Sequence, residues 1–95
     1  MNRTPKERLY WLLLLYKNSQ IDAETFCNEF HITFDHDLNE HLSDIEYTLF
    51  KEISVVSARY SGFEEDHLKY PGVYFTSIDV DKAVKKANLE LNLNN

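Results

Sequence analysis

The sequence contains few of the residues that build tight turns and covalent cross-links. Only two glycines and two prolines occur among its 95 residues. An all-β sandwich needs turn residues about every 8–12 positions, so this scarcity argues against that fold class. Cys27 is the only cysteine, which excludes an intramolecular disulfide and is typical of a reducing compartment.

Long hydrophobic runs are also lacking. The longest apolar run, residues 9–16, is eight residues long, far short of the roughly 20 that span a bilayer. Arg3, Lys6 and Arg8 precede it, as the basic residues of a signal peptide would, but the polar residues 17–20 offer no small-residue cleavage site. We interpret the run as a buried helix and expect a cytoplasmic protein without membrane contacts.

Apolar residues are plentiful, at 43% of the chain, and aromatic residues make up 14%. A chain of 95 residues has the length of one ordinary domain, and it can bury a core without cross-links. We therefore expect a single helical domain over residues 1–95.

The first half of the sequence carries two helix-start signals. Thr4 and Glu7 have the spacing of a capping box, which predicts a helix over about residues 5–17. Because this segment is apolar nearly all round, we expect its helix to be surrounded by the others. Asp22 and the helical spacing of the apolar residues after it predict a second helix over about residues 23–34.

A third, longer helix is predicted over about residues 38–61. Asp37 and Glu40 have capping-box spacing, and apolar residues follow at helical intervals. Gly62 stands where a left-handed C-terminal cap is expected.

The last helix is predicted over about residues 77–91, with Thr76 or Ser77 as its cap. Residues 63–76 look like a long connection, in which residues 73–75 form an extended piece without a pairing partner. Four helices with mostly short connections predict an all-α fold, a small antiparallel four-helix bundle. We favour a monomer.

The sequence offers little for catalysis or metal binding. His31, His36 and His41 are spaced by five, which spreads their side chains around a helix instead of gathering them at one zinc ion. Cys27 lies in an apolar helical stripe, where a thiol is inert. Two glycines cannot build a phosphate-binding loop or a nucleophile elbow. We therefore predict no enzyme activity, no catalytic residues, no cofactor and no metal site.

Negative charge is the strongest feature of the chain. The net charge is −6, and residues 18–58 carry nine acidic residues against Lys51 alone. Such a surface repels nucleic acid and attracts basic partners. The alternative is an ordinary solvated face. Two acidic clusters are candidate partner-binding sites. The first consists of Glu64, Glu65 and Asp66, with Tyr60 and Tyr70 as aromatic anchors. The second consists of Asp35, Asp37, Glu40 and Asp44. We expect Phe63 and Phe75, which are near the first cluster, to belong to the core.

The order of these features resembles the self-protective colicin-like immunity family, the immunity proteins of the colicin D type. The resemblance comprises the hydrophobic opening at residues 9–13, the segment at residues 21–26, Tyr60-Ser61, the acidic residues 64–66, and a last helix that closes on Leu89 and Leu91. It covers most of the chain as a pattern of residue types without an invariant motif. Residues 66–71 also echo the aspartate, tyrosine and proline string of the DNase-colicin immunity proteins. Lys69 stands where that family has a second tyrosine. We therefore rank the resemblance to the DNase-colicin immunity proteins below the resemblance to the colicin D type.

The resemblance implies a protein that binds the C-terminal nuclease domain of a cognate toxin, often a tRNA-cleaving one, and blocks its active site. Contact-dependent growth inhibition systems use similar small antidotes. By this resemblance residues 64–66 face the toxin, and the cluster from Asp35 to Asp44 is a second candidate face. Two other hypotheses stay open: an acidic helical adaptor that binds a basic partner other than a toxin, and a subunit of an enzyme whose catalytic residues lie elsewhere.

Overall fold

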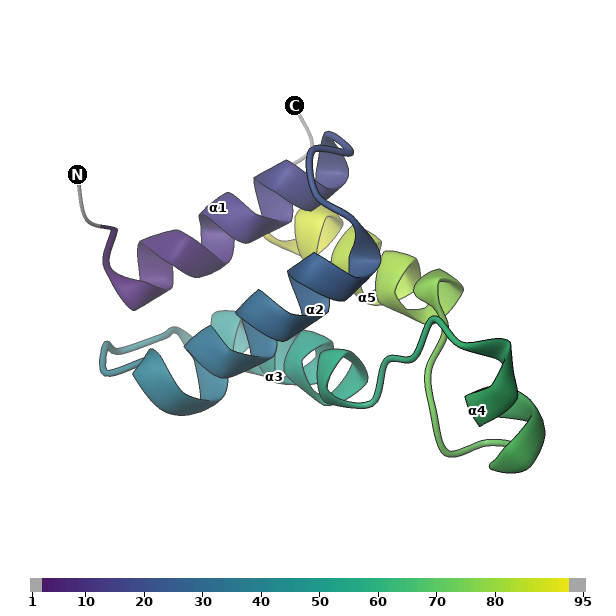
Figure 1. The fold of residues 1–95 in the computed structure, drawn as a ribbon. Coiled ribbons are helices and arrows are strands. Elements are labelled where there is room, and N and C mark those ends of the chain that lie inside the picture. Colours follow the sequence, from purple (N-terminus) through teal and green to yellow (C-terminus); the bar gives the residue numbers. More distant parts are fainter. Residues whose placement is uncertain (1–2, 93–95) are drawn as a thin grey trace.

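The chain folds into helices joined by short loops (Figure 1). The computed structural model describes residues 3–92 and contains, within them, five α-helices, one π-helical turn and no β-strand. The all-α prediction is confirmed. The elements are α1 (Pro5–Lys17), α2 (Ala23–Ile32), the π-helical turn η1 (Thr33–Asp37), α3 (Asp44–Ala58), α4 (Glu64–Lys69) and α5 (Ser77–Glu90).

Side-chain caps determine where the long helices begin. Thr4 and Glu7 form a capping box at α1, as predicted, and the Asp22 side chain accepts a hydrogen bond from the backbone of Thr25 at α2. Thr76 and Asp79 form another capping box at the start of α5. Each cap satisfies backbone N–H groups that the first turn of a helix leaves without partners.

The predicted start of the third helix is wrong. Asp37 belongs to η1, and residues 38–43 form a loop, so α3 begins six residues later with a capping box of Ser43 and Glu46. Glu40 serves another helix, because its Oε1 accepts a hydrogen bond of 3.0 Å from the backbone N–H of Lys6 in the first turn of α1.

The predicted end of that helix is also wrong. The helix ends at Ala58 with Arg59 as its cap, and Gly62 does not have the positive φ of a left-handed cap. Gly62 lies instead beside a side chain: a Cβ at this position would be 2.9 Å from the hydroxyl oxygen of Tyr60. A larger residue at position 62 would therefore disturb the close approach to the Tyr60 side chain, and not a left-handed turn.

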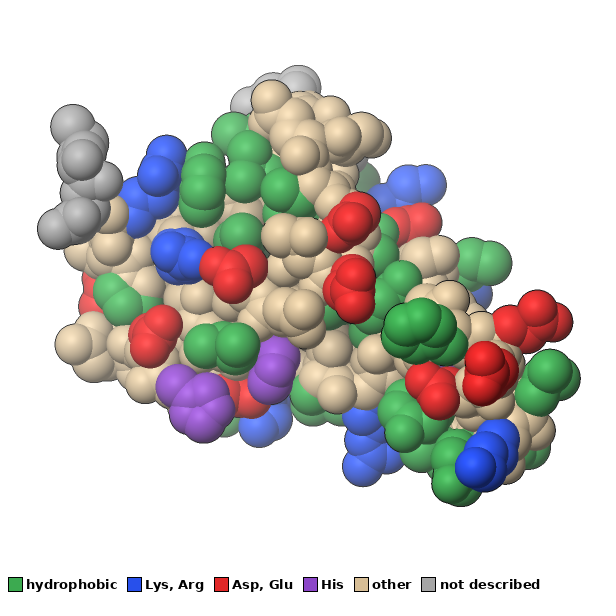
Figure 2. Space-filling model, in the orientation of Figure 1, with side chains coloured by type: hydrophobic (Ala, Val, Ile, Leu, Met, Phe, Trp, Pro, Cys, Tyr) green, Lys and Arg blue, Asp and Glu red, His purple; other side chains and the backbone are tan. Residues whose placement is uncertain are grey.

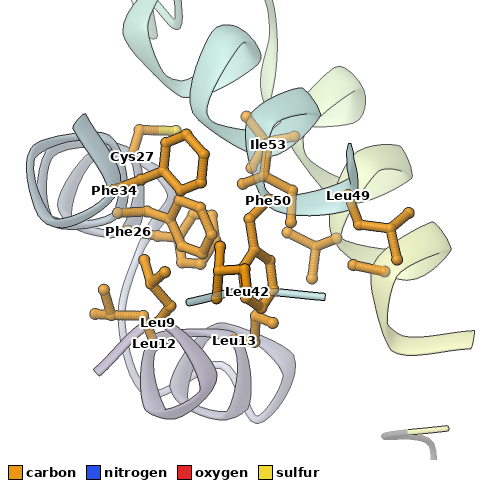
Figure 3. Packing of buried hydrophobic residues seen from close by; sticks show 14 residues of the cluster. Leu9, Leu12, Leu13, Phe26, Cys27, Phe34, Leu42, Leu49, Phe50 and Ile53 are labelled. Atoms are coloured by element: carbon orange, nitrogen blue, oxygen red, sulfur yellow. The ribbon is translucent and has the colours of Figure 1, made fainter. Parts of the chain in front are cut away.

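The core lies between α1, α2, α3 and α5, and aromatic rings fill its middle. The rings of Phe26 and Phe30 have centroids 5.2 Å apart, and Phe30 meets Phe50 edge-on at 5.8 Å. Figure 3 shows side chains of the first three α-helices converging on this cluster. The buried apolar residues are Leu9, Leu12, Leu13, Phe26, Cys27, Phe30, Phe34, Leu42, Leu49, Phe50, Ile53, Val80, Val84 and Ala87.

The expectation of a central first helix is wrong. Leu14 is 53% exposed, so α1 keeps one apolar side open to solvent. The second helix, α2, packs against α1 on one side and α3 on the other (Figure 1). Within residues 3–92, no helix has both the length and the apolar character needed to cross a bilayer.

The connection between α3 and α5 contains α4, a helix that the sequence did not predict. None of the six residues of α4 is buried. The extended piece at residues 73–75 does find a partner, because Tyr60 and Phe75 form an isolated parallel bridge. We call residues 61–75 the α4 lobe; it projects from one end of the molecule (Figure 1).

Candidate partner-binding surface

Two carboxylates of the α4 lobe are free to meet a partner. Glu64 and Glu65 lie in the first turn of α4, and both are exposed. Neither side chain makes a hydrogen bond or ion pair with another residue in the part of the chain that the structure describes. Acidic residues stabilise the first turn of a helix, so the two carboxylates also favour α4 itself.

Asp66, the third residue of the predicted cluster, is half-buried and holds the lobe together. Its Oδ2 accepts a hydrogen bond of 2.6 Å from the hydroxyl of Ser61, and the Ser61 Oγ accepts one of 3.1 Å from the backbone N–H of Phe63. The Nε2 of His67 donates to the Ser61 carbonyl oxygen at 2.9 Å. Asp66 therefore positions the start of α4.

Large apolar side chains surround these carboxylates on the surface. Leu68 is 74% exposed, and Tyr70 and Val73 are about half exposed at 48% and 47%. Phe63 is 68% exposed, so its predicted place in the core is wrong, and Phe75 is only partly buried. Figure 2 shows apolar and acidic side chains mixed over the end of the molecule that carries α4. Exposed apolar side chains gathered in this way are typical of interaction sites.

Tyr60 lies at the junction between the lobe and the core. It is partly buried and packs against the hydrophobic cluster. Burial raises the pKa of its hydroxyl, and the nearby Cys27, Glu24 and Asp22 raise that pKa further. All three of these groups lie on α2 or at its cap, and the carboxylates of Glu24 and Asp22 place negative charge near Tyr60.

A groove separates the lobe from α2. Its volume is about 180 Å³. Sequence reasoning missed Glu24, Asn28 and Ser57, because only the tertiary fold brings α2 and the end of α3 to the lobe. The one available signal was the spacing of Glu24 and Asn28, which puts them on the same face of a helix. The groove is lined by Glu24, Asn28, Ser57, Tyr60, Ser61, Gly62, Phe63, Asp66 and Tyr74.

The second predicted cluster lies at the opposite end of the molecule (Figure 1). Asp35 accepts a hydrogen bond of 3.1 Å from the Ser54 hydroxyl, and Glu40 caps α1 as described above. Asp37 and Asp44 are exposed. The two clusters therefore do not form one surface, and half of the second cluster is occupied by contacts within the fold.

Little in the described residues suggests covalent or metal chemistry. Cys27 is buried, and burial raises the pKa of its thiol to about 11. Within residues 3–92, no three His, Cys, Asp or Glu side chains are placed to hold a metal ion. A larger hollow of about 640 Å³ lies between α5 and the turn after α1. It is open, and its lining includes both a positive charge, Lys85, and a negative charge, Asp81.

These observations define a small helical protein with a projecting lobe that carries both carboxylates and exposed apolar side chains. No protein-family model, curated protein or solved structure matches the chain. The resemblance to the colicin-type immunity families therefore stays a prediction, as does every function that it implies.

Proposed function

We propose that this chain is an immunity protein that binds a cognate bacterial toxin domain, a tRNA-cleaving nuclease, and covers its basic substrate-binding site with the α4 lobe. The observation that carries the proposal is the composition of the lobe surface. Glu64 and Glu65 are exposed without partners in the described chain, and Phe63 and Leu68 are exposed beside them. In this proposal the chain acts as a monomer in the cytoplasm.

The electrostatic part of the argument concerns what such a toxin needs. A nuclease holds the phosphate backbone with lysine and arginine side chains, and this charge supplies much of its affinity. Carboxylates at the same positions compete with phosphates, and complementary charge accelerates association. The net charge of −6 acts in the same direction.

The apolar part concerns affinity. Aromatic and long aliphatic side chains that become buried at the centre of an interface dominate its binding free energy. Phe63, Leu68 and Tyr70 expose such surface around α4, and a partner that covers it gains the hydrophobic contribution of about 25 cal/mol per Å² of apolar area.

The lobe is a better candidate than the second cluster. Asp35 and Glu40 already accept hydrogen bonds from Ser54 and Lys6. A partner that recruited them would have to break contacts that stabilise the fold. Glu64 and Glu65 have no such contacts in residues 3–92.

The experiment is co-purification with the protein encoded immediately upstream, followed by association kinetics and a cleavage assay on total tRNA. Changing Glu64→Lys together with Glu65→Lys should slow association at low salt by at least about tenfold and weaken protection of tRNA. Asp66 is left intact because it positions α4.

The matched control changes Asp37→Lys together with Asp44→Lys, which alters the net charge equally at the other end of the molecule. Association of this control should be slowed much less. Equal slowing by both variants would contradict the lobe as the binding site. If no toxin binds and a basic protein without toxin activity does, the chain is the acidic adaptor instead.

A further inference from the structure

We infer that the groove between α2 and the α4 lobe receives one arginine side chain of the basic partner. This inference rests on the proposed function for the existence of that partner. It adds a defined pocket, and residues of α2, to a surface otherwise formed by the lobe.

The size and shape of the groove suit a single side chain. Its volume of about 180 Å³ is below the roughly 300 Å³ at which sites for small-molecule ligands begin. Glu24 and Asn28, one helical turn apart, form the α2 wall, and Tyr60, Asp66 and Tyr74 come from the other side. One extended side chain can enter between these walls, whereas a whole helix cannot.

The carboxylates that line the groove have too few hydrogen-bond donors around them. Glu24 is exposed and makes no hydrogen bond or ion pair with another residue in the described range. The Oδ2 of Asp66 accepts from Ser61, and its Oδ1 accepts no hydrogen bond from the rest of residues 3–92. Both carboxylates are acceptors, so the missing group is a donor with positive charge.

The floor of the groove gives an independent indication. Ser57 lines the groove and is only 5% exposed. Its hydroxyl has no oxygen or nitrogen partner among the described residues, and its polar neighbour is the Cys27 thiol, a weak acceptor. The hydroxyl oxygen is itself closed off from the groove. A buried hydroxyl without a strong partner is costly, and rotation of the Ser57 side chain from Cys27 toward the groove would give it one when a polar group enters.

Arginine fits these walls better than lysine. Its guanidinium is planar and presents several N–H donors in fixed directions, so it can bond two carboxylates while it stacks on an aromatic ring. Tyr60 and Tyr74 provide such rings. Cations over aromatic faces are attracted by the ring electrons.

The test is an NMR titration of the labelled full-length protein with N-acetyl-arginine amide, and with N-acetyl-citrulline amide as the neutral analogue of nearly the same shape. The arginine probe should shift backbone amides of Glu24, Asn28, Ser61 and Asp66, and the citrulline probe should not. Shifts of equal size with both probes, or none with the arginine probe, would overturn the inference.

Two variants locate the probe. Glu24→Gln should weaken its binding about fivefold, because it removes one carboxylate at an exposed position. Gly62→Ala should also weaken it, because the new Cβ pushes the Tyr60 hydroxyl from its place. The control Glu90→Gln changes an exposed carboxylate of α5 outside both the groove and the lobe, and it should leave binding unchanged. Weakening by Glu90→Gln equal to that by Glu24→Gln would overturn the assignment to the groove.

The outcome separates this inference from the proposed function. If the arginine probe does not bind, but the double change at Glu64 and Glu65 still slows association with a toxin domain, the groove inference fails and the proposed function stands. If the probe binds as expected and no toxin domain associates, the groove assignment stands and the proposed function fails.

Discussion

The backbone N–H of Phe75 donates a hydrogen bond of 2.7 Å to the carbonyl oxygen of Arg59. Two residues after Arg59, the N–H of Ser61 donates to the carbonyl oxygen of Phe75 at 3.0 Å. This pair of bonds joins the two ends of the α4 lobe across the intervening residues. The lobe is therefore held by its base, while α4 itself buries no residue.

The core and the lobe should respond differently to loss of a phenylalanine. Phe30→Ala removes a fully buried ring and should lower the free energy of unfolding by about 3–5 kcal/mol. Phe63→Ala removes a ring that is 68% exposed and should change it by less than about 0.5 kcal/mol. Urea denaturation measures both, and similar losses for the two variants would contradict the placement of Phe63.

The start of α3 can be tested through its cap. Ser43→Ala removes the side-chain oxygen that accepts from the backbone of Glu46, and it should destabilise the protein by about 1 kcal/mol. Asp37→Ala removes the residue that the sequence pattern favoured and should have a much smaller effect. Thermal denaturation followed by circular dichroism compares them. A larger loss for Asp37→Ala would support the earlier helix start.

The thiol of Cys27 should be unreactive in the native state. Burial raises its pKa to about 11, so the thiol stays protonated at pH 8, and a disulfide reagent such as Ellman's should react slowly until urea is added. The unfolded thiol loses its proton near pH 9, below the folded pKa. This contribution to stability is therefore present below pH 9 and lost as the pH rises toward 11.

Cys27→Ala provides the control for the alkaline range. The variant should lack the part of the pH-dependent loss that belongs to the thiol, while the tyrosines continue to contribute. Fast labelling of the native protein at pH 8 would show that Cys27 is accessible, which would contradict its burial.

Ser61 should govern the order of the lobe and leave the core almost untouched. Ser61→Ala removes the hydrogen bonds to Asp66 and Phe63, each worth about 1 kcal/mol. Amide hydrogen exchange should accelerate in α4, whereas amides of α2 should keep their protection. Equal acceleration in both helices would mean that the lobe and the core unfold together.

The sequence predicted the parts of the fold that local chemistry determines. Caps at Thr4, Asp22 and Thr76 begin helices where their patterns indicate. Local chemistry does not decide between two competing caps. Asp37 and Ser43 both stand three residues before a glutamate, and the structure uses the second, while Glu40 accepts a hydrogen bond from the first turn of α1.

The candidate site was predictable only in part, because local patterns do not show tertiary contacts. The sequence indicated the acidic cluster at residues 64–66. Phe63 was assigned to the core from its hydrophobicity alone. Phe63 is 68% exposed in a lobe whose two ends are joined by the bridge between Tyr60 and Phe75, a contact between residues 15 positions apart. For Glu24 the sequence showed only a helix face shared with Asn28, because α2 and the lobe meet only in the folded chain.

The bridge between Tyr60 and Phe75 also has an evolutionary consequence. Because the chain leaves and re-enters the body of the protein at neighbouring points, the segment between them behaves like an insert with adjacent ends. Such segments tolerate changes in length and sequence more readily than the packed helices that carry them. Exchange of this insert would change the partner that the lobe fits, while the scaffold of α1, α2, α3 and α5 continued to fold.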